Sequence, residues 1–354
     1  MTRSPTKRIR IGQVEIGGGA PVVVQSMTST DTRDVEATCA QIDRLSQAGC
    51  ELVRVAVPDE KAAQVLGDIK SRIDLPLVAD IHFDHRLALM ALSQGVDGLR
   101  VNPGNIGGRA EVKKIAAEAK AREVPIRVGV NAGSLEKDLL KKYGRPNPEA
   151  MVESAHREIA MLEDAGFDRI KISLKSSDVL DTVSAYRLMS AQTDYPLHLG
   201  VTEAGTLIAG TVKSSIGLGL LLADGIGDTI RVSLTRDPVD EVRVGYEILR
   251  ALNLRHRGPE IISCPTCGRC EIDLFSLVEQ VEHDLSGVAD PIKIAVMGCV
   301  VNGPGEAKAA QVGIAGGRGQ GILFRDGELV RKVPESDLAD ALVDEVFRII
   351  NTKK

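Results

Sequence analysis

Four of the six cysteines gather near the carboxyl end of the sequence: Cys264, Cys267, Cys270 and Cys299. Three of them stand in the run CPTCGRC, whose proline and glycine favour a turn that presents thiolates to one metal centre. No secretory signal precedes them, so a disulfide framework is not expected. Four thiolates would suit tetrahedral zinc, and the start of the run is typical of iron–sulfur proteins. The spacing alone favours neither metal site.

The segment after Cys299 reads VVNGPGE and offers a ligand of another kind. Its NGPG sequence predicts a tight turn that would bring Glu306 back towards the thiolate of Cys299. A carboxylate is a hard ligand that iron in a sulfide cluster holds weakly, so it could leave and free one iron for a substrate. A closed zinc site has no use for such a ligand. As a ligand, Glu306 would favour an iron–sulfur cluster, whereas the spacing alone favours a solvent-exposed turn residue at this position.

Four apolar segments repeat one pattern, an arginine between two aliphatic residues. The arginines are Arg54, Arg100, Arg127 and Arg231. In a strand, a side chain points to the face opposite to that of its two neighbours. Because helices are expected to cover the outer face of the sheet, the arginines are predicted to point into the interior of a barrel.

Charged groups in such an interior need partners, because desolvating an unpaired charge costs several kcal/mol. Two acids follow predicted strands, Asp80 and Glu203, and they cannot balance four arginines together with Lys175. A ligand with several negative charges is implied, and a phosphate or diphosphate fits best because guanidinium groups bind its oxygens in pairs. The alternative is a layer of internal salt bridges without a ligand.

Further polar residues stand at or just after the carboxyl ends of the predicted strands, where TIM-barrel active sites lie. They are Asn102, Asn131, Lys175, Thr202, Glu203 and Ser233. The run ADIHFD adds His82, which should lie on the same side as Asp80 because one residue separates them in an extended segment. These positions favour a binding or catalytic site over a purely structural layer.

Eight apolar, β-branched runs predict the strands that would position these side chains. They are Val22–Met27, Leu52–Val57, Leu77–Asp80, Gly98–Val101, Ile126–Val130, Ile170–Leu174, Leu197–Val201 and Thr229–Leu234. Segments with helical spacing lie between them, the clearest being Val35–Ala48, Glu60–Arg72, Val112–Arg122 and Glu149–Ala165. Eight such units in about 250 residues are typical of a TIM (β/α)8 barrel, and a doubly wound open sheet is the alternative.

A second, smaller domain is predicted after the barrel. The helix Val239–Leu252 would complete the eighth unit, and Leu254–Glu260 is interpreted as a linker. We therefore place the barrel at residues 1–258 and an α+β domain with the four cysteines at residues 259–354. Its expected elements are a helix at Leu274–Leu285, a strand at Ile292–Met297, a hairpin turning at Asp326–Gly327 and a helix at Ser336–Asn351.

The composition excludes several classes of protein. The chain has 354 residues, 43% of them hydrophobic and 26% charged, which is typical of a folded protein with more than one domain. Aromatic residues make up 3% and the net charge is -5, so nucleic acid is not an expected partner. No apolar run is long enough for a membrane helix, and the basic amino terminus lacks the apolar stretch of a secretory signal. We predict a cytoplasmic protein without membrane association.

Several motifs, in their order and spacing, resemble the bacterial 4-hydroxy-3-methylbut-2-enyl diphosphate synthases of the methylerythritol phosphate route to isoprenoids. They are QSMT at Gln25–Thr28, ADIHFD at Ala79–Asp84, LRVNPGN at Leu99–Asn105, GVNAGSL at Gly129–Leu135, LGVTEAG at Leu199–Gly205, CPTCGR and VNGPGE. The resemblance covers essentially the whole chain. It implies a [4Fe–4S] enzyme that reductively opens 2-C-methyl-D-erythritol 2,4-cyclodiphosphate with loss of water, using electrons from flavodoxin or ferredoxin.

The resemblance also implies roles for individual residues. The cluster ligands would be Cys264, Cys267, Cys299 and Glu306, which omits Cys270 although the spacing would include it. Contacts to the diphosphate and the diol would come from Arg54, Arg100, Asn102, Arg127, Asn131, Lys175, Arg231 and Ser233, and the match near the substrate extends to Asp80, His82, Thr202, Glu203 and Asn302. We assign Thr202 and Asn302 to substrate binding. Glu203 is the first candidate for the acid that protonates the leaving oxygen, with His82 second, and Asp80 completes the predicted catalytic set.

Two other functions stay open on the residues alone. A zinc-containing phosphosugar aldolase or isomerase would need only the barrel, and an iron–sulfur electron carrier would need only the small domain.

The length of the linker limits how the small domain can reach the mouth of a barrel. The eighth helix would run back about 21 Å towards the amino-terminal face, and the linker spans at most about 25 Å. We therefore predict, as the resemblance also implies, a head-to-tail homodimer in which each small domain caps the partner's barrel.

Overall fold

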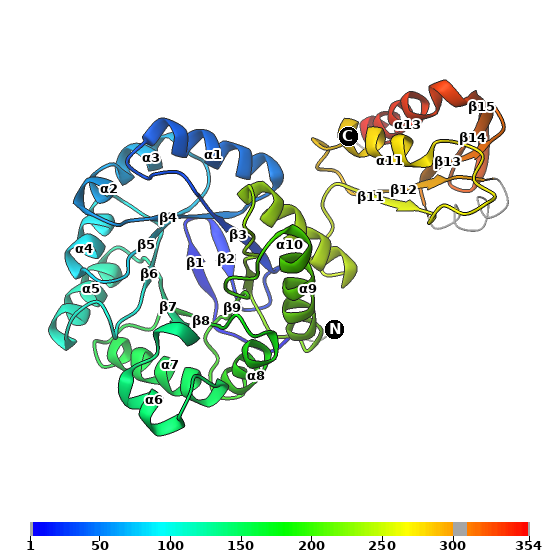
Figure 1. The fold of residues 1–354 in the computed structure, drawn as a ribbon. Coiled ribbons are helices and arrows are strands. Elements are labelled where there is room, and N and C mark those ends of the chain that lie inside the picture. Colours follow the sequence, from blue (N-terminus) through cyan, green and yellow to red (C-terminus); the bar gives the residue numbers. More distant parts are fainter. Residues whose placement is uncertain (1–2, 300–309, 353–354) are drawn as a thin grey trace. The chain divides into compact units, whose positions relative to one another are not determined.

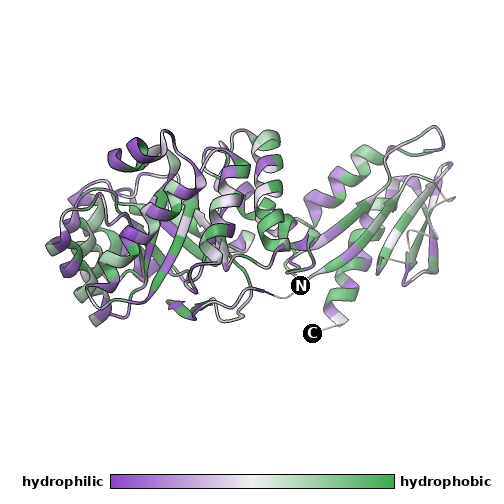
Figure 2. Cartoon of the chain, turned by 90° about the horizontal axis from the view of Figure 1, so that it is seen from below, coloured by the Kyte–Doolittle hydropathy of each residue, from purple (hydrophilic) through white to green (hydrophobic). Residues whose placement is uncertain are grey.

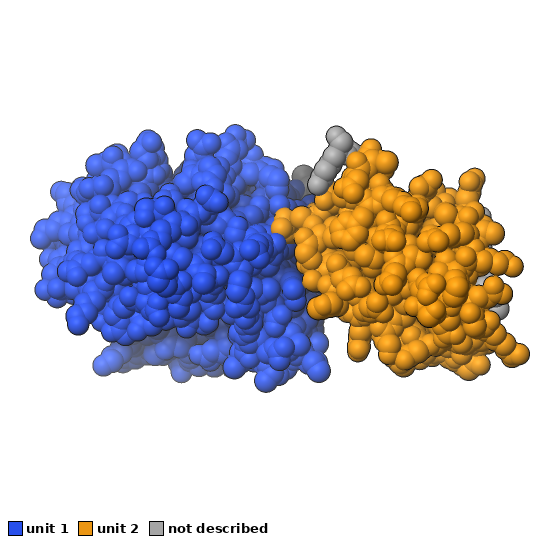
Figure 3. Space-filling view, turned by 90° about the horizontal axis from the view of Figure 1, so that it is seen from above, with its two compact units in different colours: residues 1–255 blue, residues 256–354 orange. Residues whose placement is uncertain are grey.

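The computed structural model describes residues 3–299 and 310–352 (Figure 1). The chain divides into two compact units, Met1–Arg255 and His256–Lys354 (Figure 3). Within the described ranges, no helix combines the length and the apolar character that crossing a membrane would need.

The first unit is built around an eight-stranded sheet whose strands follow the predicted runs. They are β3 (Val23–Met27), β4 (Leu52–Ala56), β5 (Leu77–Asp80), β6 (Gly98–Val101), β7 (Ile126–Asn131), β8 (Ile170–Lys175), β9 (His198–Leu199) and β10 (Thr229–Ile230). All neighbours are parallel, in the order β8-β7-β6-β5-β4-β3-β10-β9. A further parallel bridge joins Ile172 to Leu197 and brings the two ends of the sheet together. The predicted TIM barrel is confirmed, and the open sheet is not.

Helices connect the strands and surround the ring (Figure 1). They are α1 (Val35–Ala48), α2 (Glu60–Gln64), α3 (Leu66–Arg72), α4 (His85–Ser93), α5 (Arg109–Ala121), α6 (Lys137–Tyr143), α7 (Pro148–Glu163), α8 (Val179–Ser190), α9 (Leu207–Ala223) and α10 (Pro238–Ala251), with a 3-10 turn η1 (Ala132–Ser134). The prediction of one helix over residues 60–72 is wrong, because α2 ends and α3 begins at Val65. Asp34 and Asp59 start α1 and α2 by accepting a hydrogen bond from a free N–H of the first turn.

The four strands that carry the arginines have an apolar face towards the helices and a charged face towards the barrel interior, as predicted. The aliphatic neighbours of the four arginines are buried in the core beneath the helices: Val53, Val55, Leu99, Val101, Ile126, Val128, Ile230 and Val232. Figure 2 shows hydrophobic and hydrophilic colours mixed along the helices, as expected for helices that cover a core with one face. The arginines take the opposite face of each strand and point into the barrel.

An amino-terminal hairpin closes one end of the barrel. It consists of β1 (Ile9–Ile11) and β2 (Val14–Ile16), which pair antiparallel. Its isoleucines pack against Val23, Leu52 and Val78, which lie at or near the first residues of β3, β4 and β5. Because apolar side chains fill this end, a polar site is left to the carboxyl ends of the strands.

In its described residues, the second unit is a five-stranded sheet with two long helices. Its elements are β11 (Pro259–Ser263), α11 (Leu274–Asp284), β12 (Ile292–Met297), β13 (Val312–Gly317), β14 (Gln320–Arg325), β15 (Glu328–Pro334), η2 (Glu335–Asp337) and α13 (Leu338–Thr352). The strands β11, β12 and β13 are parallel, and β14 and β15 form the predicted antiparallel hairpin. Strand β11 was not predicted, and it begins within the segment interpreted as a linker. Pro259 is the first residue of this edge strand, a position at which a strand tolerates proline.

Candidate active site and metal centre

Asp80 stands at the centre of the charged barrel interior. It is the last residue of β5 and is 5% exposed. Its carboxylate lies 3.2 Å from Arg100 Nη1, 3.6 Å from Arg54 Nε and 3.6 Å from His82 Nε2. Burial alone would raise the pKa of Asp80, but Arg54, the hydrogen bond from His82 and Arg100 outweigh it and hold that pKa well below its usual range. Asp80 is therefore an ionised group that fixes two arginines.

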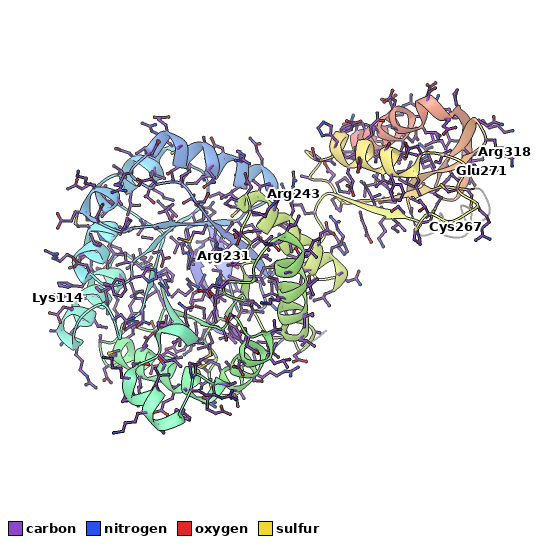
Figure 4. The ribbon with its side chains drawn as sticks, in the orientation of Figure 1. Lys114, Arg231, Arg243, Cys267, Glu271 and Arg318 are labelled. Atoms are coloured by element: carbon purple, nitrogen blue, oxygen red, sulfur yellow. The ribbon has the colours of Figure 1, made fainter. Side chains whose placement is uncertain are left out.

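Arg231 has a different partner, Glu241 of α10. Its Nη2 lies 3.3 Å from both carboxylate oxygens of Glu241, and Figure 4 shows Arg231 inside the ring of strands. Glu241 also accepts hydrogen bonds from the Ser26 hydroxyl at 3.1 Å and the Leu234 N–H at 3.0 Å. The sequence suggested Glu203 as the second acid among the arginines, and this is corrected: the pairing carboxylate is Glu241.

Arg127 and Lys175 form no ion pair within the described part of the chain. Arg127 is 4% exposed, donates from Nη1 to Ser173 Oγ at 3.0 Å, and leaves its buried Nε without a partner there. Lys175 Nζ lies 3.4 Å from His198 Nε2. Burial, followed by the nearby positive charges, lowers the pKa of both groups. This excess of positive charge favours an anion-binding site over an internal salt-bridge layer.

Two glycines make room for these cations inside the barrel. A Cβ added to Gly129 would lie 2.8 Å from Arg100 Nε, and one added to Gly200 would lie 2.6 Å from Lys175 Nζ. Any larger residue at either position would displace a charged side chain. Glycine at these two positions therefore leaves the space that the side chains of Arg100 and Lys175 occupy.

The remaining predicted residues follow the carboxyl ends of the strands. Asn102 follows β6, Asn131 ends β7, Lys175 ends β8, Thr202 and Glu203 come after β9, and Ser233 comes after β10. His82 follows β5 and is half exposed. Glu203 is exposed and has a φ of 51°, in the left-handed region that is rare for residues with a side chain. Such a backbone is typical of residues held in place at functional sites.

The cysteines of the second unit follow two neighbouring parallel strands. Cys264 comes directly after β11, and Cys299 comes shortly after β12, so both lie at the same edge of the sheet. The N–H of Gly298 donates to Cys264 Sγ at 3.4 Å. This hydrogen bond holds the Cys264 sulfur beside the residue that precedes Cys299.

Cys267 and Cys270 have different surroundings. Cys267 is exposed, and hydrogen bonds from the Arg269 backbone and side chain lower the pKa of its thiol. Figure 4 shows Cys267 at one end of the unit, where Glu271 and Arg318 form an ion pair at 3.0 Å. Cys270 packs against the hydrophobic core and donates from Sγ to the Ile272 carbonyl at 3.3 Å. Cys267 is thus the better-placed metal ligand.

Asn302 and Glu306 lie outside the described residues. Inside them, no group of three His, Cys, Asp or Glu side chains is assembled around one point. The donor set of Cys264, Cys267 and Cys299 nevertheless fits a soft metal centre, because it offers thiolates at one sheet edge together with an N–H donor.

Comparison with known proteins settles the family. The model for the GcpE TIM-barrel domain matches residues 6–246, and that for the GcpE protein C-terminal domain matches residues 260–348. The chain belongs to the GcpE family. The resemblance predicted from the motifs is therefore confirmed over both units.

Relatives in the GcpE family share one name, 4-hydroxy-3-methylbut-2-en-1-yl diphosphate synthase (flavodoxin). The protein from Geobacter sulfurreducens is 62% identical over 99% of both chains. That from Thermodesulfovibrio yellowstonii is 61% identical over 97% of this chain and 99% of its own. Among solved structures, dihydropteroate synthase from Stenotrophomonas maltophilia covers 71% of this chain and 98% of its own with a TM-score of 0.52 and 15% identity. At that identity the likeness shows only a common barrel fold.

Proposed function

We propose that this GcpE-family chain converts 2-C-methyl-D-erythritol 2,4-cyclodiphosphate into 4-hydroxy-3-methylbut-2-enyl diphosphate by reductive ring opening and dehydration. The excess of positive charge in the barrel supports this most strongly, because Arg127 and Lys175 have no carboxylate partner among the described residues. A cyclic diphosphate would supply the missing negative charge. The names of the relatives point to the same reaction.

The residues proposed to act on the substrate divide into three groups by chemistry. The cations Arg54, Arg100, Arg127, Lys175 and Arg231 would hold the diphosphate, while Asn102, Asn131, Thr202, Ser233 and Asn302 would bind through neutral polar groups. Glu203 would deliver the proton that dehydration requires, and His82 is the second candidate. Asp80 stays ionised and orients Arg54 and Arg100.

The second unit would hold a [4Fe–4S] cluster. Its ligands would be Cys264, Cys267, Cys299 and Glu306, and the hydrogen bond from the Cys270 thiol to the Ile272 carbonyl supports leaving that residue out. When bound, the cluster supplies electrons to the substrate. We place the two domains at residues 1–258 and 259–354. Flavodoxin is the proposed electron donor because the relatives carry it in their name, with ferredoxin as the alternative, and the cytoplasm is the proposed location.

We also propose the head-to-tail homodimer. An exposed apolar stripe supports self-association: Ile208, Val212, Ile216 and Leu220 recur at every fourth position of α9, and Ile208 is 80% exposed. Mixing Arg127→Ala and Cys299→Ser subunits should restore activity, because one site of the heterodimer then has both parts intact. Activity that stays absent despite demonstrated subunit exchange would contradict the dimer.

Anaerobic turnover of the cyclodiphosphate with a low-potential reductant tests the activity directly. The expected product is 4-hydroxy-3-methylbut-2-enyl diphosphate, identified by mass spectrometry, from a brown protein that contains iron and sulfide. A colourless protein with stoichiometric zinc would favour the aldolase or isomerase. A brown protein that fails to bind the cyclodiphosphate would favour the electron carrier.

A further inference from the structure

Three oxygen atoms converge on a small space beside Gly104, in the loop between β6 and α5. A Cβ added to Gly104 would lie 3.2 Å from Asn102 Oδ1, 3.3 Å from Glu158 Oε1 and 3.8 Å from Glu136 Oε1. Glu158 belongs to α7, and Glu136 immediately precedes α6. Two carboxyl groups therefore face the side-chain amide of a residue at the barrel mouth.

This cluster is short of hydrogen-bond donors. Glu158 is 1% exposed and Asn102 is 6% exposed. In the described ranges, Glu158 Oε2, Glu136 Oε2 and Asn102 Oδ1 are buried and have no hydrogen-bond partner. Ionised carboxylates and amide oxygens are all acceptors, so they cannot satisfy one another. A buried unpaired acceptor is costly, and one added proton would turn an acceptor into a donor.

The charges around Glu158 favour that proton. Burial, together with the negative charge of Glu136, raises the pKa of Glu158 to about 8, although the Gly104 N–H and the charge of Arg100 act in the opposite direction. These are the groups that face Glu158 from the β6–α5 loop, from β6 and from the segment before α6. Glu158 is thus a neutral carboxylic acid at pH 7.

We propose that protonated Glu158 is a positioning residue that donates a hydrogen bond to Asn102 Oδ1 and thereby turns the Asn102 NH2 group towards the barrel mouth. The inference rests on the proposed function, which assigns Asn102 to substrate binding. Phosphate and hydroxyl oxygens accept hydrogen bonds, so they need the NH2 end of the amide. An ionised Glu158 would instead accept from that NH2 group and draw it away from the mouth.

Substrate affinity should therefore fall as Glu158 loses its proton. We expect the dissociation constant of the cyclodiphosphate, measured by calorimetry on the intact protein, to rise about tenfold or more between pH 7 and pH 9. Glu158→Gln keeps a donor at this position and cannot ionise, so it should abolish this alkaline loss. Asn102→Ala should abolish it too, because Glu158 acts through Asn102. Glu158→Leu, which has no donor, should bind weakly at both pH values.

Infrared spectroscopy of the substrate-free protein tests the proton separately. A protonated carboxyl band should be present at pH 7, disappear as the pH rises through about 8, and be missing in Glu158→Gln. A spectrum that is the same in both proteins would overturn the inference, as would an unchanged pH profile of binding in Glu158→Gln. Tight Mg²⁺ binding that Glu158→Gln removes would also overturn it, by showing a cation in place of the proton. If no protein binds the cyclodiphosphate at any pH, the proposed function fails, whereas the infrared band still reports on Glu158.

Discussion

In the barrel, charged side chains are buried and held by partners from several elements, whereas the cysteines of the second unit lie at a sheet edge with few contacts. Asp80 fixes Arg54 and Arg100, and Glu241 fixes Arg231. By contrast, Cys267 is exposed, and Cys264 receives one backbone hydrogen bond. The barrel thus holds these cations with its own carboxylates, whereas the proposed metal centre would depend on the metal for its assembly.

The largest effect should come from a cysteine at the sheet edge. Cys299→Ser removes a proposed ligand, so iron, sulfide, the visible absorption and turnover should all be lost. Cys270→Ser is the matched control: its thiol donates to the Ile272 carbonyl and serine keeps a donor there, so the cluster and much of the activity should remain. Glu306→Ala should give a cluster that assembles poorly. Loss of the cluster in Cys270→Ser with an intact cluster in Glu306→Ala would reverse the ligand assignment.

At the barrel mouth, Glu203→Gln should separate binding from chemistry. Gln keeps the size of the side chain but cannot donate the proton needed for dehydration. Turnover should fall about 100- to 10,000-fold with little change in the affinity for the cyclodiphosphate. Anaerobic kinetics and calorimetry measure the two quantities. Near-normal turnover would transfer the acid role to another group, with His82→Gln the next variant to examine.

Variants of two arginines compare a side chain that has an ion-pair partner, Arg231, with one that has none in the described residues, Arg127. Arg127→Leu and Arg231→Leu should each weaken cyclodiphosphate binding about ten- to a hundredfold and leave the cluster spectrum unchanged. Only Arg231→Leu should lower the free energy of unfolding, by about 1 to 3 kcal/mol, because it leaves Glu241 buried without its ion pair. Urea unfolding of both variants measures this. Equal binding by both variants and the original protein would point to an internal salt-bridge layer.

A further effect concerns the pH dependence of barrel stability. Glu158 has a pKa of about 8 in the folded protein and an ordinary value of 4.5. The folded state therefore holds a proton that the unfolded chain releases, so the free energy of unfolding should fall as the pH rises from 4.5 to 8. The contribution is on the order of 5 kcal/mol, and Glu158→Gln should remove it. A pH dependence that persists in this variant would place its cause elsewhere.

The sequence predicted the barrel because alternating strands and helices each carry a simple apolar pattern. It also placed the four arginines inside, since each stands between two aliphatic residues. Glu241 and Glu158 were missed because they occupy core-facing positions of helices, where pattern analysis expects apolar residues. A carboxylate at a core-facing helix position indicates that a polar partner must lie nearby. The sequence does not identify that partner, because tertiary packing determines it. For Glu158, that partner lies in a distant loop.

The cysteine motif shows a different limit of the sequence. In CPTCGRC the three thiols are equivalent by spacing, and only the fold distinguishes them. Cys264 and Cys270 both lie beside Gly298, but Cys264 Sγ accepts from the Gly298 N–H, whereas Cys270 Sγ donates to the Ile272 carbonyl. Neither contact is visible in the spacing of the motif.

The central claim is that the barrel binds the cyclodiphosphate independently of the cluster. It is tested most directly by titrating the cyclodiphosphate into two variants under anaerobic conditions. One is Cys299→Ser, which should lack the cluster, and the other is cluster-loaded Arg127→Leu. If the barrel is the anion site, the first should bind within about tenfold of the original protein, and the second should bind about ten- to a hundredfold more weakly. Binding that disappears with the cluster but is unaffected in Arg127→Leu would contradict the account.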